Sequence, residues 1–138
     1  MSSDVRISVV PRAGRQTASG GSAWEPKMGY SRAVRSGSFI AISGTVGIGA
    51  DGKYSSDLAE QTRRSLQIIR AAIEALGGKI EHVVRTRMYV IDVSKWEEVA
   101  RVHGQVFGEI RPATAIVQVA KLIDAEAQIE IEADAIVS

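Results

Sequence analysis

The chain has 138 residues, which is enough for one domain with a hydrophobic core but not for two. Hydrophobic residues make up 45% and charged residues 24% of it, and the formal net charge of +1 encodes no strong attraction to nucleic acid or to an anionic membrane. The sequence has no cysteine and two histidines, which excludes a disulfide, a thiolate metal site and a histidine-rich metal site. It therefore predicts neither a metal nor a cofactor.

No apolar run in the sequence approaches the roughly 20 residues that span a bilayer. The first residues, MSSDVRISVV, lack the basic region, the long apolar region and the small-residue cleavage site of a secretory signal. We therefore expect a cytoplasmic protein with no membrane partner.

The first 29 residues predict one short strand followed by a long loop. Residues 5–10 have the composition of a strand, which Pro11 ends. Residues 11–29 are rich in glycine, serine and arginine and show no periodicity, so we expect an irregular loop that is either a lid over a binding site or disordered. Trp24 is the exception in this polar segment, and an indole there is expected to pack against its own chain or a partner.

The next segment predicts a β-hairpin over Tyr30–Gly44, with Ser36 and Gly37 in its turn. Residues 47–52 then match the pattern G-x-G-x-x-G. A dinucleotide-binding site requires these glycines to open a helix, whereas Asp51-Gly52 is typical of a turn. We therefore interpret residues 47–52 as a turn and not as a nucleotide site.

Two helices are expected, over residues 57–76 and 94–107, because apolar side chains recur there at spacings of three and four. Each begins with a pair that resembles a capping box: Asp57 with Glu60, and Ser94 with Glu97. His103 lies next to the apolar stripe of the second helix, and we interpret it as a packing histidine rather than a catalytic one.

The last predicted strand has an acidic face. Over residues 128–137 apolar and polar side chains alternate, so three carboxylates share one side of the strand: Glu130, Glu132 and Asp134. Like charges repel one another and are costly to bury unpaired. This face therefore needs water, arginines or a neighbouring subunit.

The strand expected over residues 82–91 carries groups that can meet this acidic row. One of its faces holds Val84, Thr86, Met88 and Val90, and the other holds Val83, Arg85, Arg87 and Tyr89. Arg85 and Arg87 are the candidates to pair with carboxylates across the sheet.

The predicted order is strand, hairpin, helix, strand, helix, strand, strand. The expected fold class is therefore α+β, a two-layer sandwich of a mixed six-stranded sheet with two helices on one face. We expect a single domain over residues 1–138.

Several short motifs keep an order and spacing that extend over residues 28–137: Tyr30–Val34, Gly37, Ser43-Gly44, Gln61-Thr62, Val83-Val84, Asp92, Phe107-Gly108, Arg111–Ala113 and Ile129–Ala133. Together they resemble the Rid protein family, also called the YjgF/YER057c/UK114 or "endoribonuclease L-PSP" family. The resemblance implies a chorismate-mutase-like fold that assembles as a homotrimer with ligand clefts between subunits. It also implies a small-molecule partner, since the best-studied members deaminate reactive imines and enamines by adding water.

The resemblance assigns Glu130 to the glutamate that orients the water and Tyr30 to a tyrosine of the pocket. Thr114 stands where deaminating members have an arginine that binds the substrate carboxylate, and a threonine supplies one neutral hydrogen bond in place of a bidentate cation. Two further pocket positions correspond to Ile116 and Ser94. The candidates for a replacement cation are Arg32, Arg87 and Arg111. Glu130 is either a general base or a structural carboxylate that pairs with an arginine.

Three functions are compatible with these residues. The first is a Rid-like hydrolytic deaminase of imines or enamines with a non-standard substrate anchor. The second is a non-catalytic trimer that binds a small metabolite between apolar walls formed by Trp24, Tyr30 and Ile116. The third, a ribonuclease, is disfavoured by the small net charge and the absence of a histidine pair.

Overall fold

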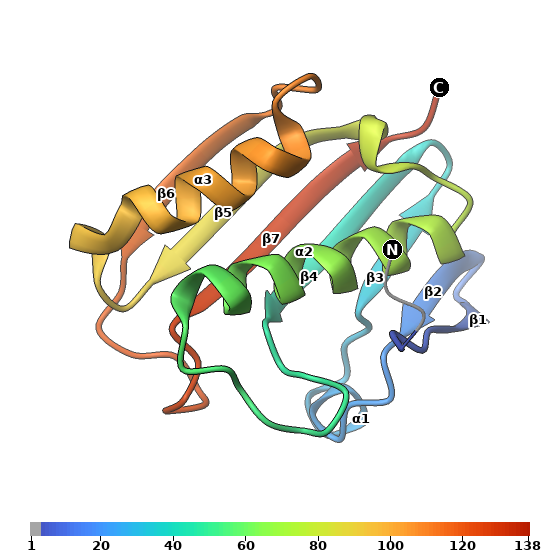
Figure 1. Cartoon of the computed structure of the whole chain (residues 1–138). Coiled ribbons are helices and arrows are strands. Elements are labelled where there is room, and N and C mark those ends of the chain that lie inside the picture. Colours follow the sequence, from blue (N-terminus) through green and yellow to red (C-terminus); the bar gives the residue numbers. More distant parts are fainter. Residues whose placement is uncertain (1–3) are drawn as a thin grey trace.

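Strand β7 (Ile129–Ile136) lies in the middle of a mixed sheet in this computed structural model, which describes residues 4–138 (Figure 1). The other strands are β1 (Ser8–Arg12), β2 (Arg15–Ser19), β3 (Ala33–Ser36), β4 (Phe39–Val46), β5 (Val83–Val90) and β6 (Ala113–Gln118). Their order is β1-β2-β3-β4-β7-β5-β6. β7 is antiparallel to both of its neighbours, and β5 and β6 form a parallel pair.

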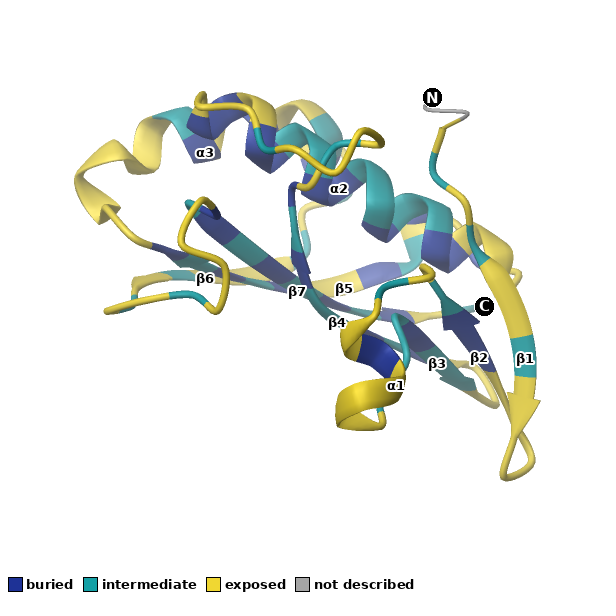
Figure 2. Ribbon diagram, turned by 90° about the horizontal axis from the view of Figure 1, so that it is seen from below, coloured by how far each residue is buried: buried dark blue, intermediate teal, exposed yellow. Residues whose placement is uncertain are grey.

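Two long helices, α2 (Leu58–Ala75) and α3 (Trp96–Phe107), cover one face of the sheet and leave the other face open (Figure 2). Alternate residues of β7 point into this core and are fully buried: Ile129, Ile131, Ala133 and Ala135. They pack with apolar side chains of α2 that include Leu66, Ile69 and Ile73. Within residues 4–138, no helix is both long and apolar enough to cross a bilayer.

The short helix α1 (Trp24–Met28) lies apart from the two long helices (Figure 2). Gly29 ends it in the left-handed conformation, with φ of 74°, and the backbone N–H groups of Gly29 and Tyr30 both donate to the Glu25 carbonyl. The side chain of Glu25 is buried, and its Oε2 accepts hydrogen bonds from the backbone of Gly20 and Ser22. α1 is therefore tied both to the turn that precedes it and to Tyr30.

The N-terminal part of the sheet differs from the prediction, because the sheet has seven strands instead of six. The segment expected as an irregular loop, residues 11–29, contains the end of β1, all of β2 and α1. Ala13 and Gly14 have φ of 51° and 76°, so they form the tight turn that joins β1 to β2. β2 pairs with β3, where Thr17 lies opposite Val34 and Ala18 opposite Ala33. Thr17 and Ala18 are both buried.

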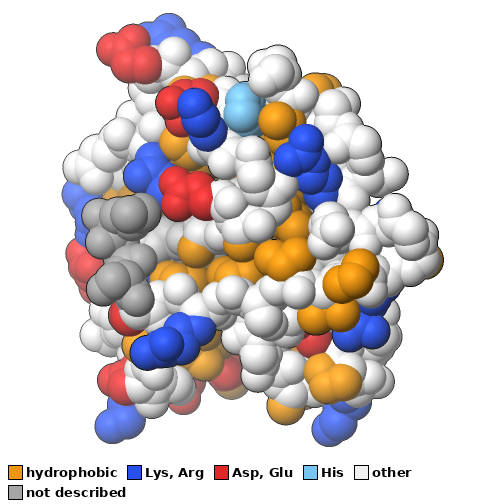
Figure 3. Space-filling model, turned by 90° about the vertical axis from the view of Figure 1, so that its right-hand side faces the viewer, with side chains coloured by type: hydrophobic (Ala, Val, Ile, Leu, Met, Phe, Trp, Pro, Cys, Tyr) orange, Lys and Arg blue, Asp and Glu red, His pale blue; other side chains and the backbone are white. Residues whose placement is uncertain are grey.

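β1 forms the edge of the sheet, and Val9 on it is 42% exposed. Figure 3 views the molecule from this side, where hydrophobic side chains gather across the middle of the face with charged ones around them. β1 contains Pro11, which has no N–H to donate and so makes this edge a poorer template for pairing with another strand.

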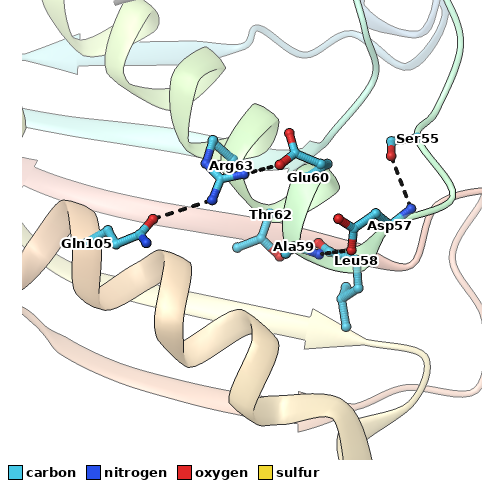
Figure 4. A network of polar contacts seen from close by, with 8 residues as sticks. All are labelled: Ser55, Asp57, Leu58, Ala59, Glu60, Thr62, Arg63 and Gln105. Atoms are coloured by element: carbon cyan, nitrogen blue, oxygen red, sulfur yellow. Dashed lines mark hydrogen bonds and ion pairs between the residues drawn. The ribbon is translucent and has the colours of Figure 1, made fainter.

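α2 begins as the sequence predicts, with Asp57 as its N-cap (Figure 4). Its carboxylate accepts a hydrogen bond from the Ala59 N–H at 3.2 Å. Glu60 does not complete a capping box, because it pairs with Arg63 one turn later. Arg63 also lies 3.4 Å from Gln105 Oε1 and so connects α2 to α3 (Figure 4).

The start of α3 differs from the prediction. Ser94 and Glu97 were expected to form a capping box, but the N-cap of α3 is Lys95, which makes no side-chain cap hydrogen bond. Asp92 instead caps the turn before α3, since its Oδ1 accepts from the Ser94 N–H at 3.1 Å and from the Ser94 hydroxyl at 2.6 Å. A short 3₁₀ turn, η2 (Val93–Lys95), then leads into α3 at Trp96. Asp92 caps η2 because it lies directly before this turn, which is the N-cap position.

β5 is predicted correctly in position but not in the faces of its first residues. The pairing of β5 with β7 shifts between Val83 and Arg85, so a bulge places one extra residue there. Val83 is consequently buried in the core, and Val84 is 43% exposed. From Arg85 onward the predicted faces hold, with Thr86, Met88 and Val90 buried.

Residues 47–52 form a turn, as predicted. The Gly49 N–H donates to the Lys53 carbonyl at 2.8 Å, and Ile48 pairs with Tyr54. α2 begins only at Leu58, so these glycines do not open a helix.

Candidate functional site

Two of the three carboxylates on β7 find partners on the adjacent strand β5. Arg87 Nη1 lies 3.1 Å from Asp134 Oδ2, and the Tyr89 hydroxyl donates to Glu132 Oε1 at 2.7 Å. This hydrogen bond, together with burial, raises the pKa of Tyr89 above its ordinary value. Both carboxylates therefore serve to bind β5 to β7, and Arg87, one of the candidate ligand-binding residues, is engaged in this structural role.

Glu130 has a different environment. Its half-buried side chain lies against Gly44 of β4, so closely that a Cβ at position 44 would be 2.4 Å from Glu130 Oε2. Burial raises the pKa of the Glu130 carboxyl above its ordinary value of 4.5, the nearby Arg32 charge lowers it, and Glu132 adds a smaller upward contribution. A carboxylate with a raised pKa on a strand next to a glycine gap is suited to accept and return a proton.

Arg32 is the cation that the structure brings to Glu130. Its Nη2 donates to the Gly44 carbonyl at 2.6 Å, and its guanidinium carbon lies 5.6 Å from the centre of the Tyr30 ring. Its Nε is buried without a hydrogen-bond partner among the described residues. Tyr30, Arg32 and Glu130 therefore form one cluster around Gly44, at the end of the sheet where β4 and β7 meet through the pair of Val46 with Glu130.

The other two candidate cations are placed less favourably. Arg87 is paired with Asp134, as described above. Arg111 is exposed, its Nε donates to the Gly108 carbonyl at 3.0 Å, and it has a positive φ of 54°. The structure thus favours Arg32 among the three arginines that the sequence left open.

Trp24 lies on α1 and is 50% exposed, with Lys27 Nζ positioned 5.6 Å from the centre of its ring. Because α1 is hydrogen-bonded to Tyr30 through the Glu25 carbonyl, Trp24 belongs to a segment that leads directly into the cluster. Met28 on the same helix is 63% exposed. α1 therefore offers apolar surface next to the site.

Thr114 does not join this cluster within one chain. Thr114 pairs with Thr86 of β5, which in turn pairs with Ala133 of β7. Thr114 is therefore two strands away from Glu130, in a row that crosses β7 three residues beyond it. Its hydroxyl contacts Thr86 Oγ1 at 2.6 Å on the face that the helices cover, whereas Glu130 is on the opposite side of β7. Thr114 and Glu130 therefore face different sides of the sheet.

Two more predicted site residues also lie apart from Glu130. Ile116 is half-buried and packs against the core in the row that pairs it with Met88. Ser94 follows β5 and is bonded to Asp92. One chain thus unites Tyr30, Arg32 and Glu130 and leaves Thr114, Ile116 and Ser94 outside their cluster.

Sequence analysis missed two residues that shape these sites. Gly44 belongs to a recognised motif, but its role, to leave room for the Glu130 carboxyl, depends on a contact between β4 and β7. Thr86 is fully buried and connects Thr114 to His103 of α3. The sequence held one signal for Thr86, because it is the single polar residue on the otherwise apolar face predicted for β5.

Comparison with known proteins places this chain in a family. The family model described as Endoribonuclease L-PSP matches residues 20–137. A solved structure of a YjgF/YER057c/UK114 family member from Mycobacterium tuberculosis has 46% sequence identity and a TM-score of 0.83, and the match covers 89% of this chain and 99% of that one. The YjgF gene product from Escherichia coli is 33% identical, with a TM-score of 0.73, and the match covers 78% of this chain and 87% of the other.

A curated relative carries an activity in its name. The 2-iminobutanoate/2-iminopropanoate deaminase of Escherichia coli (strain K12) is 33% identical over 111 residues, which is 78% of this chain and 86% of the relative. The resemblance seen in the motifs is therefore confirmed, and the chain belongs to the YjgF/YER057c/UK114, or Rid, family.

Proposed function

We propose that this protein is a hydrolytic deaminase of reactive imines or enamines that anchors its substrate in a non-standard way. The observation that carries the proposal is the Glu130 cluster: a half-buried carboxylate with a raised pKa, set against Gly44 and beside a cation and a phenol. A related Escherichia coli protein is named as a deaminase of 2-iminobutanoate and 2-iminopropanoate, which supports the reaction class.

Glu130 acts as the base that activates water. It takes a proton from the water as the water oxygen bonds to the C=N carbon, and this proton passes to the substrate nitrogen. The carbinolamine that results then loses ammonia: Glu130 takes the hydroxyl proton as the carbonyl forms and gives it to the amino nitrogen as the C–N bond breaks. A raised pKa makes the Glu130 carboxylate a stronger base toward the water, and the carboxyl then returns the proton to the more basic substrate nitrogen.

Arg32 supplies the positive charge of the site. Its guanidinium is held by the Gly44 carbonyl and by the Tyr30 ring, so it is positioned before substrate arrives. An arginine presents a planar fork that suits an anionic group of the substrate. Tyr30 forms one wall of the pocket through the face of its ring.

We also propose that the chain assembles as a homotrimer in which a neighbouring copy completes the cleft. In one chain, Thr114 and Glu130 face different sides of the sheet, so a single ligand does not meet both. The open face of the sheet carries large exposed apolar side chains: Phe39, Val84, Val117 and Ile136. Such a surface supports an interface between copies. Sedimentation of the full chain measures the assembly state, and a monomer at micromolar concentration contradicts this part of the proposal.

The test of the activity is ammonia release from imines generated in place by an amino-acid oxidase, measured above the spontaneous rate. We expect Glu130→Gln to lower the catalysed rate by about a hundredfold or more, because it removes a general base. Glu132→Gln is the matched control, since it lies on the same strand face and the glutamine oxygen still accepts from Tyr89. A Glu130→Gln variant as active as wild type contradicts the proposed role of Glu130.

A third variant, Thr114→Arg, distinguishes a loss of proton transfer by Glu130 from a lack of a cation that binds the substrate carboxylate. If wild type is inactive on imino acids and Thr114→Arg is active, the pocket assignment holds and the natural substrate is one without the carboxylate. If wild type, Glu130→Gln and Thr114→Arg are all inactive, the deaminase proposal fails.

The half-exposed Trp24 supports a second candidate function, a protein that binds a small metabolite without turnover. α1 places the exposed side chains of Trp24 and Met28 next to Tyr30, where they provide apolar contact area. Such a protein shows ligand-dependent thermal stabilisation and no ammonia release, because a ligand that binds the folded state alone raises the apparent stability.

A further inference from the structure

A groove lies between the middle of α2 and the end of α3, on the side of the molecule that carries the helices. Figure 1 shows the two helices side by side over the same face of the sheet. The groove has a volume of about 490 Å³, and the 3₁₀ turn η1 (Ile80–His82) also lines it. Cavities that hold small ligands have volumes of about 300–1,000 Å³, so this groove is large enough for one.

The groove is separate from the cluster around Glu130. No residue of that cluster lines it, and Glu130 lies on the other face of the sheet. Because the groove is on the helix side, it stays accessible when the open face of the sheet packs against other copies of the chain. A ligand in this groove therefore has a role beyond the proposed deaminase reaction, and its binding does not depend on that reaction.

One part of the groove wall is apolar. Ile80 of η1, Val106 of α3 and Ile110, which follows α3, all line it. Gly104 of α3 keeps the groove open, since a Cβ at this position would meet nothing within 4 Å. Such a wall suits the aliphatic part of a ligand.

Another part of the wall carries charges of both signs. Arg70 of α2 is half-buried, and its side chain has no hydrogen-bond or ion-pair partner within residues 4–138. The exposed side chains of Glu81 on η1 and Glu109, two residues after α3, also line the groove. A ligand with a single charge would meet a like charge from the wall, whereas a ligand with an ammonium and a carboxylate finds a partner for each.

The arrangement of polar groups favours a peptide over a free amino acid. Arg70 and the two glutamates belong to different walls of the groove, and a dipeptide separates its terminal charges by up to about 7 Å. Gln105 lies in the groove as well, and its Oε1 faces Arg63 Nη2 at 3.4 Å. Its Nε2 is therefore available to donate to a peptide carbonyl.

We propose that the groove between α2 and α3 binds a short zwitterionic peptide with aliphatic side chains. The peptide carboxylate pairs with Arg70, which replaces the hydration that the half-buried guanidinium loses. The peptide ammonium lies toward Glu81 and Glu109. The aliphatic side chains pack on the apolar part of the wall.

The experiment follows amide ¹H–¹⁵N NMR signals of the full chain during titration with leucyl-leucine. We expect the signals of Gly104 and Gly108, which line the groove, to shift, and the signal of Gly44 beside Glu130 to stay unchanged. A shift at Gly44 without shifts at Gly104 and Gly108 would place the peptide at the Glu130 cluster and overturn the inference. Absence of any shift overturns it as well.

Three analogues test the chemical class of the ligand. Leucyl-leucinamide lacks the carboxylate and should bind about tenfold more weakly, because it loses a charged hydrogen bond to a half-buried arginine. N-acetyl-leucyl-leucine lacks the ammonium and should bind about threefold more weakly, because pairs with exposed carboxylates contribute less. Free leucine should bind more weakly than leucyl-leucine. If the dipeptide binds no more tightly than leucyl-leucinamide or leucine, the proposed class is wrong.

Two variants test the groove itself. Arg70→Gln should lower the affinity for leucyl-leucine to that for leucyl-leucinamide and leave the latter unchanged. Arg101→Gln is the matched control, because Arg101 is an exposed arginine of α3 that does not line the groove. Gly104→Leu fills the groove with a residue that favours the helix, so it should abolish binding while thermal unfolding shows a folded protein. Wild-type affinity in Arg70→Gln or in folded Gly104→Leu contradicts the inference.

Failure of this inference is distinguishable from failure of the proposed activity. Glu130→Gln should bind leucyl-leucine as wild type does, because the groove and Glu130 lie on different faces of the sheet. Ammonia release that depends on Glu130, without peptide binding, supports the deaminase and removes the peptide site. Peptide binding at Gly104 and Gly108 without any ammonia release supports the peptide site and removes the deaminase.

Discussion

The two polar clusters of this protein differ in how completely their groups are satisfied. Around Glu130, the charges of Glu130 and Arg32 are half-buried, the pKa of the carboxyl is raised by burial, and Arg32 Nε has no partner in the described part of the chain. Around Thr86, three neutral side chains satisfy one another through two short hydrogen bonds. The first cluster keeps an unsatisfied buried donor, whereas the groups of the second are hydrogen-bonded to one another.

This difference has a physical basis. A buried or half-buried charge without a full set of partners costs free energy, and folded proteins tolerate that cost where the group has a function. A neutral hydrogen-bonded chain carries little such cost and adds to stability instead. Changes to the first cluster should therefore affect activity most, and changes to the second should affect stability most.

Among changes outside the proposed catalytic residue, the largest expected effect is on activity, from Gly44→Ala. A Cβ on residue 44 would lie 2.4 Å from Glu130 Oε2 and 2.9 Å from its Cδ, so the carboxyl must move away. Because a displacement of about 1 Å in a catalytic group costs about a hundredfold in rate, we expect a loss of that order in ammonia release. Stability should change little, since the atoms displaced are the end of a flexible side chain.

Gly104→Ala is the control for this prediction. A Cβ at Gly104 meets nothing within 4 Å, and the residue lies inside α3. We expect unchanged activity and a gain in stability of about 0.5–1 kcal/mol, because alanine favours the helix. Equal activity of Gly44→Ala and Gly104→Ala would contradict the placement of Glu130 in the catalytic site.

An intermediate effect is expected from Thr86→Val, now on stability. The variant leaves His103 Nε2 without its partner and removes the bond to Thr114, so the free energy of unfolding should fall by about 1–3 kcal/mol. Thr114→Val changes the exposed end of the same chain and should cost about 0.5 kcal/mol. Urea unfolding measures both, and a larger loss for Thr114→Val would show that the buried end does not carry the stabilisation.

Much of this fold is predictable from periodicity. The alternation along β7 identifies its buried and acidic faces, and the spacing of apolar residues identifies α2 almost to its ends. The hairpin of β1 and β2 is not predictable in the same way, because Arg15–Ser19 is polar and its pairing with β3 decides which residues are buried. The bulge at Val83 likewise depends on the register with β7 and leaves no mark on the sequence of β5 alone.

The site is less predictable than the fold. Motifs single out Tyr30 and Glu130 as candidates far apart along the chain, and the arrangement of β4 with β7 brings them to one end of the sheet. The choice of Arg32 over Arg87 and Arg111 requires knowledge of which carboxylate or carbonyl each guanidinium contacts. His103 was interpreted as a packing residue, and the packing on Phe107 agrees, but its bond to Thr86 depends on how α3 lies across β5.

The smallest expected effect is the pH dependence of stability at Glu130, and it tests the comparison of the two clusters most directly. Because burial raises the pKa of this carboxyl above its ordinary value of 4.5, the folded state binds the proton at a higher pH than the unfolded state does. Between the two pKa values the folded state holds more protons, so the free energy of unfolding falls as the pH rises through that window. Below the unfolded value the carboxyl is neutral in both states and imposes no penalty.

Glu130→Gln removes this titration. The variant should therefore match wild type in stability near pH 4 and exceed it near pH 8, as measured by urea unfolding at about these two pH values. Glu132→Gln again serves as the control, since it removes a charge from the same face but weakens the hydrogen bond from Tyr89, so no gain is expected. A similar gain in both variants would mean that repulsion along the acidic row, and not the burial of Glu130, causes the penalty, and the contrast with the neutral chain at Thr86 would then extend to the whole face of β7.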